Sequence, residues 1–392
     1  MFDQIYKDFE NTVDTNKFYF KYSTDRVSTR FLLIRSLDKS DLEALYLSKT
    51  GSKMPSGAKG AQPFKYLYNS AITINELISY IENKRSEILQ IRQQENEGLI
   101  DLIANFDIVN CGIETDKVDD IVKRMVRDKS IKTKDQFEDK LNTILLPKTA
   151  NYVRWSFYNQ ITNDVIEEIL LHNRKIIPTL RKIHDIDFFV RIGDEVIPFD
   201  LKITHISSDF FDLYRKGLIE SDGPDNYVLG DNLKEIEVVK QFFKENKARL
   251  DLPNYGGKNI DELLEILRNK CDVLANRFID EMYHDRETAV YSIEEEIKKL
   301  EWWNYKYQGP RLFKNNNRFF IFLAYTNVFE DGRALKGNIE EIQRKIDQIL
   351  ENISLETLHT VRYKYEKQAD INGDYETQVI SAYIYDRKPL DL

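Results

Sequence analysis

Residues 183–204 read IHDIDFFVRIGDEVIPFDLKIT, and this stretch decides the fold that the sequence predicts. Two apolar segments, Ile186 to Ile192 and Glu195 to His205, stand on either side of the pair Gly193-Asp194. Glycine followed by aspartate between two β-rich segments is typical of a tight hairpin turn. The stretch therefore predicts two antiparallel strands joined by a hairpin.

Three charged residues stand inside this hairpin. Asp187 begins the first strand, while Asp200 and Lys202 lie in the second, separated by one residue. Residues i and i+2 of a strand project to the same face, so Asp200 and Lys202 point the same way. The hairpin brings Asp187 alongside them. Charge among apolar strand residues costs free energy unless something compensates for it, and a divalent cation between two carboxylates would do so.

The residue types favour magnesium and chemistry at phosphorus. Mg²⁺ prefers a few carboxylate oxygens, together with water and phosphate oxygens. The ammonium of Lys202 is then able to position or deprotonate the attacking water, or to neutralise charge in the transition state. A plainer interpretation is a surface hairpin that carries an ordinary exposed ion pair. We favour the metal site, because unpaired charge is rare in apolar strands.

These residues resemble the signature of the PD-(D/E)xK nuclease superfamily, the fold of most type II restriction endonucleases. Asp187 matches the first aspartate of that signature, Asp200 the second acidic position and Lys202 the lysine. Ile186 stands where the signature has proline. The resemblance covers about residues 152–206. It implies an α/β fold with a restriction-endonuclease-like core, in which helices flank a mixed central sheet.

Two positions of the implied site have alternatives. Asp185 competes with Asp187 as the first metal ligand, because we expect both on the same face of the strand. Family members often add a glutamate from the preceding helix, and either Glu167 or Glu168 fits that place. Each glutamate is equally well explained as the solvent side of an amphipathic helix.

Outside the hairpin, the sequence predicts further elements of a mixed α/β core. A helix is expected over about residues 155–172. Arg318 to Tyr325 is strongly apolar, which is typical of a central buried strand. Two more strands are expected, over Leu358 to Tyr365 and Thr377 to Tyr385. The helix that precedes them has an apolar face, formed by Ile339, Ile342, Ile346 and Ile349.

These elements divide the chain into three regions. We assign residues 151–215 and 311–392 to the catalytic core, and residues 216–310 to a helical insertion that is highly charged from about Asn232. Residues 1–150 form a mostly helical N-terminal region, a candidate module for DNA recognition or dimerisation. Within it, Phe18 to Tyr22 is strand-like, and a long helix is expected from about Asn75 to Phe106.

Composition and charge limit the class of protein. Hydrophobic residues make up 42% and charged residues 31%, as in ordinary globular proteins. No stretch has the roughly 18 uncharged apolar residues of a membrane span, and the polar, acidic start does not resemble a signal peptide, so we expect a cytoplasmic protein. The net charge of -9 counts against a non-specific nucleic-acid binder. It still allows a sequence-specific one with local basic surface.

Basic residues supply candidate contacts to DNA phosphates. Three come from a Gly- and Ser-rich loop and three from around the hairpin, namely Lys49, Lys53, Lys59, Arg181, Lys182 and His205. A second basic segment runs from Lys123 to Lys134. Solvated surface is an almost equally good explanation of the loop and of this segment.

The resemblance also implies an activity. It points to a sequence-specific endonuclease that hydrolyses phosphodiesters in double-stranded DNA with Mg²⁺, for which Mn²⁺ can substitute. Such enzymes usually work as homodimers, and a cognate methyltransferase can act on the same DNA site. Two alternatives keep the fold: a defence or repair nuclease without strict sequence specificity, and a non-catalytic DNA-binding protein.

Overall fold

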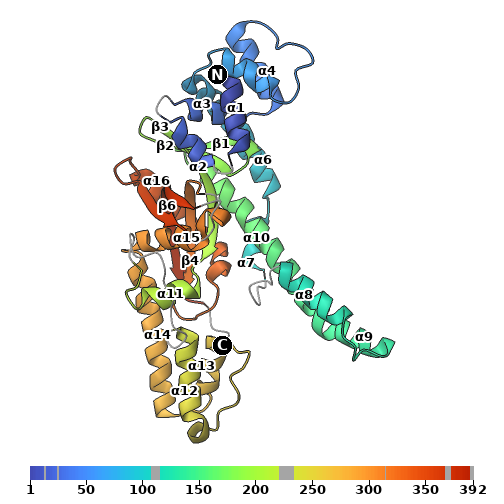
Figure 1. Ribbon diagram of the computed structural model, residues 1–392, viewed down its shortest axis with the longest axis vertical. Coiled ribbons are helices and arrows are strands. Elements are labelled where there is room, and N and C mark those ends of the chain that lie inside the picture. The colour runs from blue at the N-terminus through green and yellow to red at the C-terminus, as the bar shows by residue number, and fades with distance from the viewer. Residues whose placement is uncertain are drawn as a thin grey trace.

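The computed structural model describes residues 1–12, 15–23, 26–106, 115–219, 234–313, 315–366 and 372–388. The molecule is elongated, with a sheet in its middle (Figure 1). A helical N-terminal region lies at one end, and helices from the middle of the chain lie at the other. A helical arm leaves the body beside the sheet.

Within the described residues, six strands form one mixed sheet in the order β1-β2-β3-β4-β6-β5. The strands are β1 (Ile176–Ile183), β2 (Ile186–Ile192), β3 (Glu195–His205), β4 (Arg318–Tyr325), β5 (His359–Tyr365) and β6 (Gly373–Asp386). Pairing is parallel between β3 and β4 and between β4 and β6, and antiparallel elsewhere. The predicted mixed α/β class is confirmed, and β1 is a strand that the sequence did not predict.

The predicted hairpin is confirmed, with the expected bounds for β2 and β3. Gly193 adopts a φ of +59° in its turn, a conformation that glycine reaches without steric cost. Pairing of β3 with β2 runs from Glu195 to Phe199. From Asp200 onward β3 pairs with β4 instead, beginning opposite Arg318. The two strands of the hairpin therefore part at Asp200.

Strand β4 is buried along its whole length, as predicted. Its odd-numbered residues, such as Phe319, pack in one core with α10 (Leu146–His172) and α16 (Ile339–Asn352). Its even-numbered residues, such as Phe320, pack in a second core with α14 (Val273–Ile293) and α15 (Ile297–Phe313). The alternation of side chains along a strand thus gives β4 two apolar faces, each covered by helices.

The described N-terminal residues are helical. The elements are α1 (Phe2–Asn11), α2 (Thr15–Lys21), α3 (Val27–Arg35), α4 (Lys39–Thr50), α5 (Gln62–Asn69), α6 (Ile74–Glu95) and α7 (Leu99–Ala104). The strand-like prediction for Phe18 to Tyr22 is wrong, because Phe18 is buried from α2 against Phe31, with ring centroids 5.4 Å apart. The predicted long helix is two helices, α6 and α7, and the first begins at Ile74, where Thr73 caps it.

The arm and the middle helices complete the chain. Helices α8 (Thr115–Val126) and α9 (Lys134–Lys140) and a π-helical turn η1 (Leu141–Leu145) lead directly into α10. Between β3 and β4 lie α11 (Ser208–Tyr214), α12 (Glu235–Leu250), α13 (Ile260–Arg268), α14 and α15, and a 3₁₀ turn, η3 (Gly332–Gly337), follows β4. The predicted start of the insertion helices near Asn232 lies outside the described residues. Among the helices of the described ranges, none combines the length and hydropathy of a membrane span.

Candidate active site

Asp187 and Asp200 occupy opposite positions where β2 and β3 part. The last paired residues are Phe188 and Phe199, so one further step of the register brings Asp187 opposite Asp200. The Asp187 carboxylate accepts a hydrogen bond from the backbone N–H of Leu201, with Oδ2 2.7 Å from the nitrogen. The β2–β3 pairing has already ended at this point, so the Asp187 side chain takes the place of a strand partner for the Leu201 N–H.

Two carboxylates placed opposite each other destabilise a sheet unless positive charge lies between them. Asp187 is exposed, yet partial desolvation of its carboxyl group by the surrounding protein raises its pKa, and the nearby charge of Glu167 raises it further. Burial also raises the pKa of Asp200 to about 6. This rise persists although Arg318 pulls the other way, with its Nη1 only 2.5 Å from Asp200 Oδ2. One guanidinium therefore does not compensate the pair of carboxylates.

Lys202 lies two residues beyond Asp200 on β3 and is half-buried. Burial lowers the pKa of its ammonium, and the positive charges of Arg318 and Arg333 lower it further. No hydrogen bond or ion pair joins Lys202 to another residue within the described ranges. Its ammonium is thus close enough to Asp200 for their charges to interact, and it is not committed to a structural contact.

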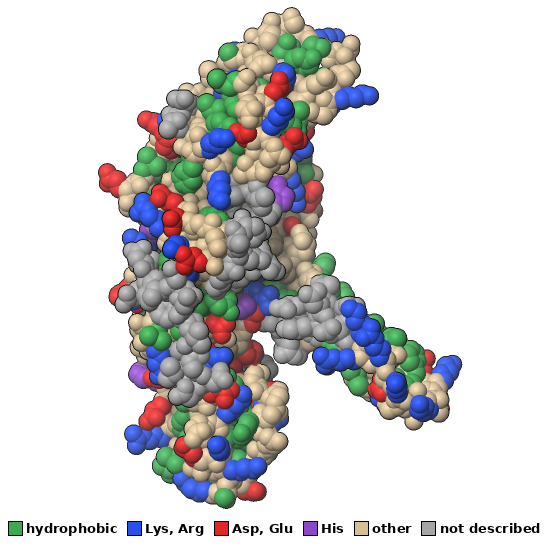
Figure 2. Space-filling view, in the orientation of Figure 1, with side chains coloured by type: hydrophobic (Ala, Val, Ile, Leu, Met, Phe, Trp, Pro, Cys, Tyr) green, Lys and Arg blue, Asp and Glu red, His purple; other side chains and the backbone are tan. Residues whose placement is uncertain are grey.

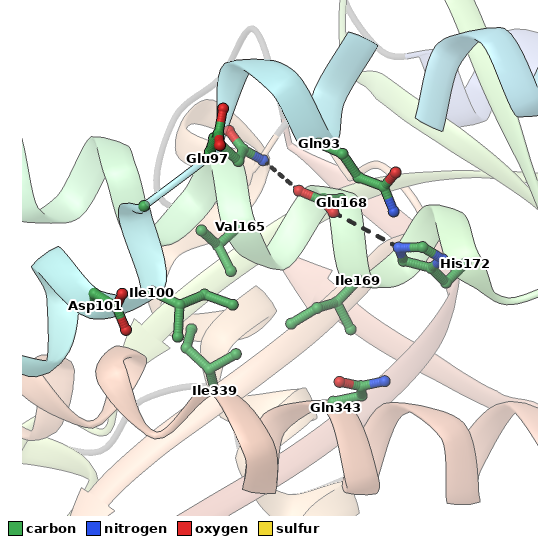
Figure 3. A pocket seen from close by; sticks show the side chains of 12 residues that line it. Gln93, Glu97, Ile100, Asp101, Val165, Glu168, Ile169, His172, Ile339 and Gln343 are labelled. Carbon is green, nitrogen blue, oxygen red and sulfur yellow. Dashed lines mark hydrogen bonds and ion pairs between the residues drawn. The ribbon is translucent and has the colours of Figure 1, made fainter. Parts of the chain in front are cut away.

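The two candidate glutamates lie on different sides of α10. Glu167 is close enough to Asp187 to raise its pKa, and burial raises the pKa of Glu167 itself. Glu168 instead accepts a hydrogen bond from Asn96 Nδ2 at 2.7 Å and lies 3.6 Å from His172 Nε2. It lines a pocket of about 670 Å³ between α6–α7, α10 and α16 (Figure 3). Of the two glutamates, only Glu167 influences the pKa of Asp187, and its Oε2 also lies 4.0 Å from Arg92 Nη2.

Asp185 is not on the strand face that the sequence predicted. It lies in the turn between β1 and β2, with a φ of +64°, because Ile183 already pairs with Ile186. The two-residue turn between Ile183 and Ile186 requires a residue in the left-handed region of backbone conformation. Aspartate adopts that conformation more readily than most other residues. The Asp185 Oδ2 atom lies 2.5 Å from His184 Nδ1, and the charge of Asp185 still raises the pKa of Asp200. Asp187 is therefore the carboxylate that stands opposite Asp200.

The three lysines predicted in one loop lie apart from the carboxylates. Lys49 belongs to the last turn of α4, and its Nζ is 2.7 Å from Glu76 Oε1. Lys53 and Lys59 are exposed in the loop that follows α4. Within the described ranges, no hydrogen bond or ion pair joins any of the three to the β2–β3 hairpin.

The three basic candidates near the hairpin lie in different settings. Arg181 and Lys182 are exposed on β1, and the Arg181 guanidinium lies 5.4 Å from the centroid of the Phe64 ring. His205 ends β3, with its Nδ1 3.1 Å from Asp331 Oδ2. Burial lowers the pKa of His205. Arg181 and Lys182 remain accessible to an anion, whereas His205 is half-buried, and among the described residues its Nδ1 has no hydrogen-bond partner although it lies near Asp331.

The sequence did not single out three basic side chains, of which Arg318 contacts Asp200 while Arg333 and Lys336 lie close enough to Lys202 for their charges to interact. Arg318 begins β4 and is 7% exposed in its ion pair with Asp200. Arg333 follows β4, where its Nη2 is 2.6 Å from Asp331 Oδ2. Lys336 is buried, and its Nζ donates to Asn159 Oδ1 at 2.5 Å and to Asn163 Oδ1 at 2.8 Å. Burial lowers the pKa of Lys336 to about 7.

Comparison with known proteins adds no family to this geometry. The chain matches none of the protein-family models, curated proteins or solved structures with which it was compared. In the described part of the chain, no group of three or more His, Cys, Asp or Glu side chains is arranged to hold a metal ion. The candidate site is thus a pair of carboxylates, with Glu167 near one and Arg318 and Lys202 near the other.

Proposed function

We propose that the protein is a Mg²⁺-dependent endonuclease that cuts double-stranded DNA at specific sequences, in the manner of type II restriction enzymes. One observation carries this proposal. Asp187 and Asp200 stand opposite each other at the parting of β2 and β3, with the ammonium of Lys202 two residues further on. A mixed sheet with α10 and α16 on one face supports a restriction-endonuclease-like core around them.

The residues present fit a hard divalent cation. Asp187 and Asp200 offer carboxylate oxygens, and both have a raised pKa because burial is not offset by enough positive charge. Oxygen donors with open space for water and phosphate are what Mg²⁺ prefers, and Mn²⁺ accepts the same donors. A bound Mg²⁺ supplies Lewis-acid activation of the scissile phosphate and of water.

Three side chains have further roles in the proposed hydrolysis. Lys202, with its lowered pKa, takes a proton from the attacking water or stabilises the negative charge that develops on the phosphate in the transition state. Glu167 adds negative charge on the Asp187 side of the pair. Arg318 holds the Asp200 carboxylate in position through their ion pair.

The proposal extends to the organisation of the protein. Residues 151–215 and 311–392 would form the catalytic core, residues 216–310 an insertion, and residues 1–150 a module for DNA recognition or dimerisation. A homodimer would bring two such sites to the two strands of the duplex. A methyltransferase that protects the same DNA sequence would be the matching partner.

The test is digestion of plasmid and phage DNA with Mg²⁺, with Mn²⁺ and with a chelator. Parent protein, Lys202→Met and Lys298→Met are compared, because Lys298 has the same acid-x-lysine spacing but is exposed on α15. We expect discrete fragments from the parent and from Lys298→Met, and none from Lys202→Met or with chelator. A smear of products would favour the less specific nuclease. Intact DNA under every condition would favour the non-catalytic DNA-binding protein.

A further inference from the structure

The arm carries charge of the opposite sign to the rest of the protein. We define the arm as residues 121–148, from the end of α8 through α9 and η1 to the start of α10. It contains eight Lys and Arg residues but only four Asp and Glu residues, in a chain whose net charge is -9. Figure 2 shows the basic side chains spread along the arm where it projects from the body.

Most of these basic side chains are open to solvent. Lys140 is the exception, because its Nζ is 2.5 Å from Asp128 Oδ2. The exposed members are Lys123, Arg124, Arg127, Lys129, Lys132, Lys134 and Lys148. Concentrating positive charge on a projecting element, when the chain as a whole is acidic, creates a local attraction for a polyanion.

We propose that the arm binds the phosphate backbone of duplex DNA and holds the duplex beside the site. The choice of DNA as the occupant rests on the proposed function, and the interaction itself rests on charge. Phosphate contacts by Lys and Arg need no base recognition, so they fix the position of a duplex without reading its sequence. An acidic protein needs such a local basic element to approach DNA at all.

The basic residues of the arm lie far from the carboxylates along the chain's helical path. It continues directly into α10, which carries Glu167 beside Asp187. At 1.5 Å per residue, Lys148 lies about 28 Å and Lys134 about 50 Å from Glu167 along the helical path. One turn of B-DNA is about 34–36 Å. The arm is therefore long enough to contact the backbone about one helical turn from the scissile phosphate.

A second copy of this chain is the competing occupant. The arm also exposes apolar side chains, including Val126, of which 77% is exposed, and Ile144 and Leu146. Two arms packed together would, however, bring two positively charged surfaces against each other, and such like-charge juxtaposition costs free energy. Charge complementarity favours DNA over self-association.

The experiment measures DNA binding without cleavage. A fluorescently labelled duplex of about 40 base pairs, long enough to reach past the arm at about 3.4 Å per pair, is titrated with full-length protein in chelator. The arm variant is Arg124→Glu/Arg127→Glu/Lys129→Glu. The control variant is Lys244→Glu/Lys247→Glu/Arg277→Glu, which changes net charge equally at exposed positions of α12 and α14.

We expect the arm variant to bind the duplex at least about tenfold more weakly, with the control close to the parent. The slope of log K against log salt should fall by about 0.9 for each phosphate that the arm no longer neutralises. Equal weakening in both variants, unchanged affinity of the arm variant, or no binding by the parent would overturn the inference. So would a change of oligomeric state in sedimentation, without a change in DNA affinity. A parent that binds through the arm but never cuts would refute only the nuclease proposal.

Discussion

The backbone N–H of Leu201 donates a hydrogen bond to the Asp187 carboxylate, 2.7 Å away, across the gap between β2 and β3. This bond holds the side chain of Asp187 opposite Asp200 although like charges there repel. Two properties of the Asp187 side chain therefore have different effects. Its acceptor oxygen stabilises the fold through the bond to Leu201, and its negative charge favours the binding of a cation.

Asp187→Asn separates the two effects, because asparagine keeps an acceptor oxygen for Leu201 but carries no charge. We expect the variant to be slightly more stable than the parent without metal, by about 0.5 kcal/mol after solvent screening. It should lose the stabilisation by Mg²⁺ and lose cutting. Calorimetric melts with and without Mg²⁺ measure this, and Asp194→Asn in the exposed turn is the control. A less stable Asp187→Asn protein would contradict the charge argument.

The raised pKa of Asp200 predicts a pH dependence with a definite sign. A carboxyl group with a folded pKa of about 6 and an ordinary value of 3.8 binds more protons in the folded state between these pH values. Its contribution to the free energy of unfolding therefore falls as pH rises from about 4 to 6. In metal-free urea melts, the free energy of unfolding of the parent should fall relative to that of Asp200→Asn as pH rises over this range. Mg²⁺ should bind more tightly above pH 6, where protons no longer compete.

Glu167 and Glu168 provide a matched pair of adjacent residues. Glu167→Gln removes charge beside Asp187, so we expect cutting to slow by at least about tenfold. Glu168→Gln alters only the contacts to Asn96 and His172, and cutting should stay near the parent rate. Single-turnover rates on one DNA substrate compare the two. Equal rates for both variants would place Glu167 outside the site.

Arg318→Met tests whether a metal can replace a buried positive charge. Removing one partner of a buried ion pair costs about 3–5 kcal/mol, because the other charge is left uncompensated. We expect a marked loss of stability without metal, since Arg318 normally lowers the pKa of Asp200. Mg²⁺ should then raise the melting temperature of the variant more than that of the parent. An equal response to Mg²⁺ would show that the cation does not bind at Asp200.

Lys336 predicts a second pH dependence, in the alkaline range. Its folded pKa of about 7 lies below the ordinary value of 10.5, so the unfolded state binds more protons between these values. The free energy of unfolding should therefore rise with pH from about 7 to 10.5. Lys336→Met lacks this titration, and the stability difference between parent and variant should grow in favour of the parent over that range. If the stability difference between parent and Lys336→Met did not change with pH, the lowered pKa of Lys336 would be contradicted.

Local sequence was sufficient for the part of the fold that holds the carboxylates. The hairpin was predictable because its turn residues and two apolar runs lie within 23 residues, 183–205. Strand β1 escaped prediction because it contains Pro178 and two adjacent basic residues, which an edge strand tolerates. The aromatic residues at Phe18 to Tyr22 imitate a strand, but tertiary packing buries Phe18 and Tyr19 on a helix.

The surroundings of the site depended on long-range register. Arg318 is far from Asp200 in sequence and meets it only because β3 and β4 pair in parallel from these two residues onward. No local pattern indicates that alignment. The difference between Glu167 and Glu168 likewise depends on which face of α10 the sheet covers. The residue types of the site were predictable from sequence, but their neighbours were not.

Helix α10 extends over 27 residues, with its outer end in the arm and its inner end beside the sheet. A helix of that length is stiff, with only gentle curvature unless something breaks its hydrogen bonds. Buried residues from Trp155 to Leu170 anchor the inner part of α10 in the core, so the direction in which the arm leaves the body is set by the same helix that carries Glu167.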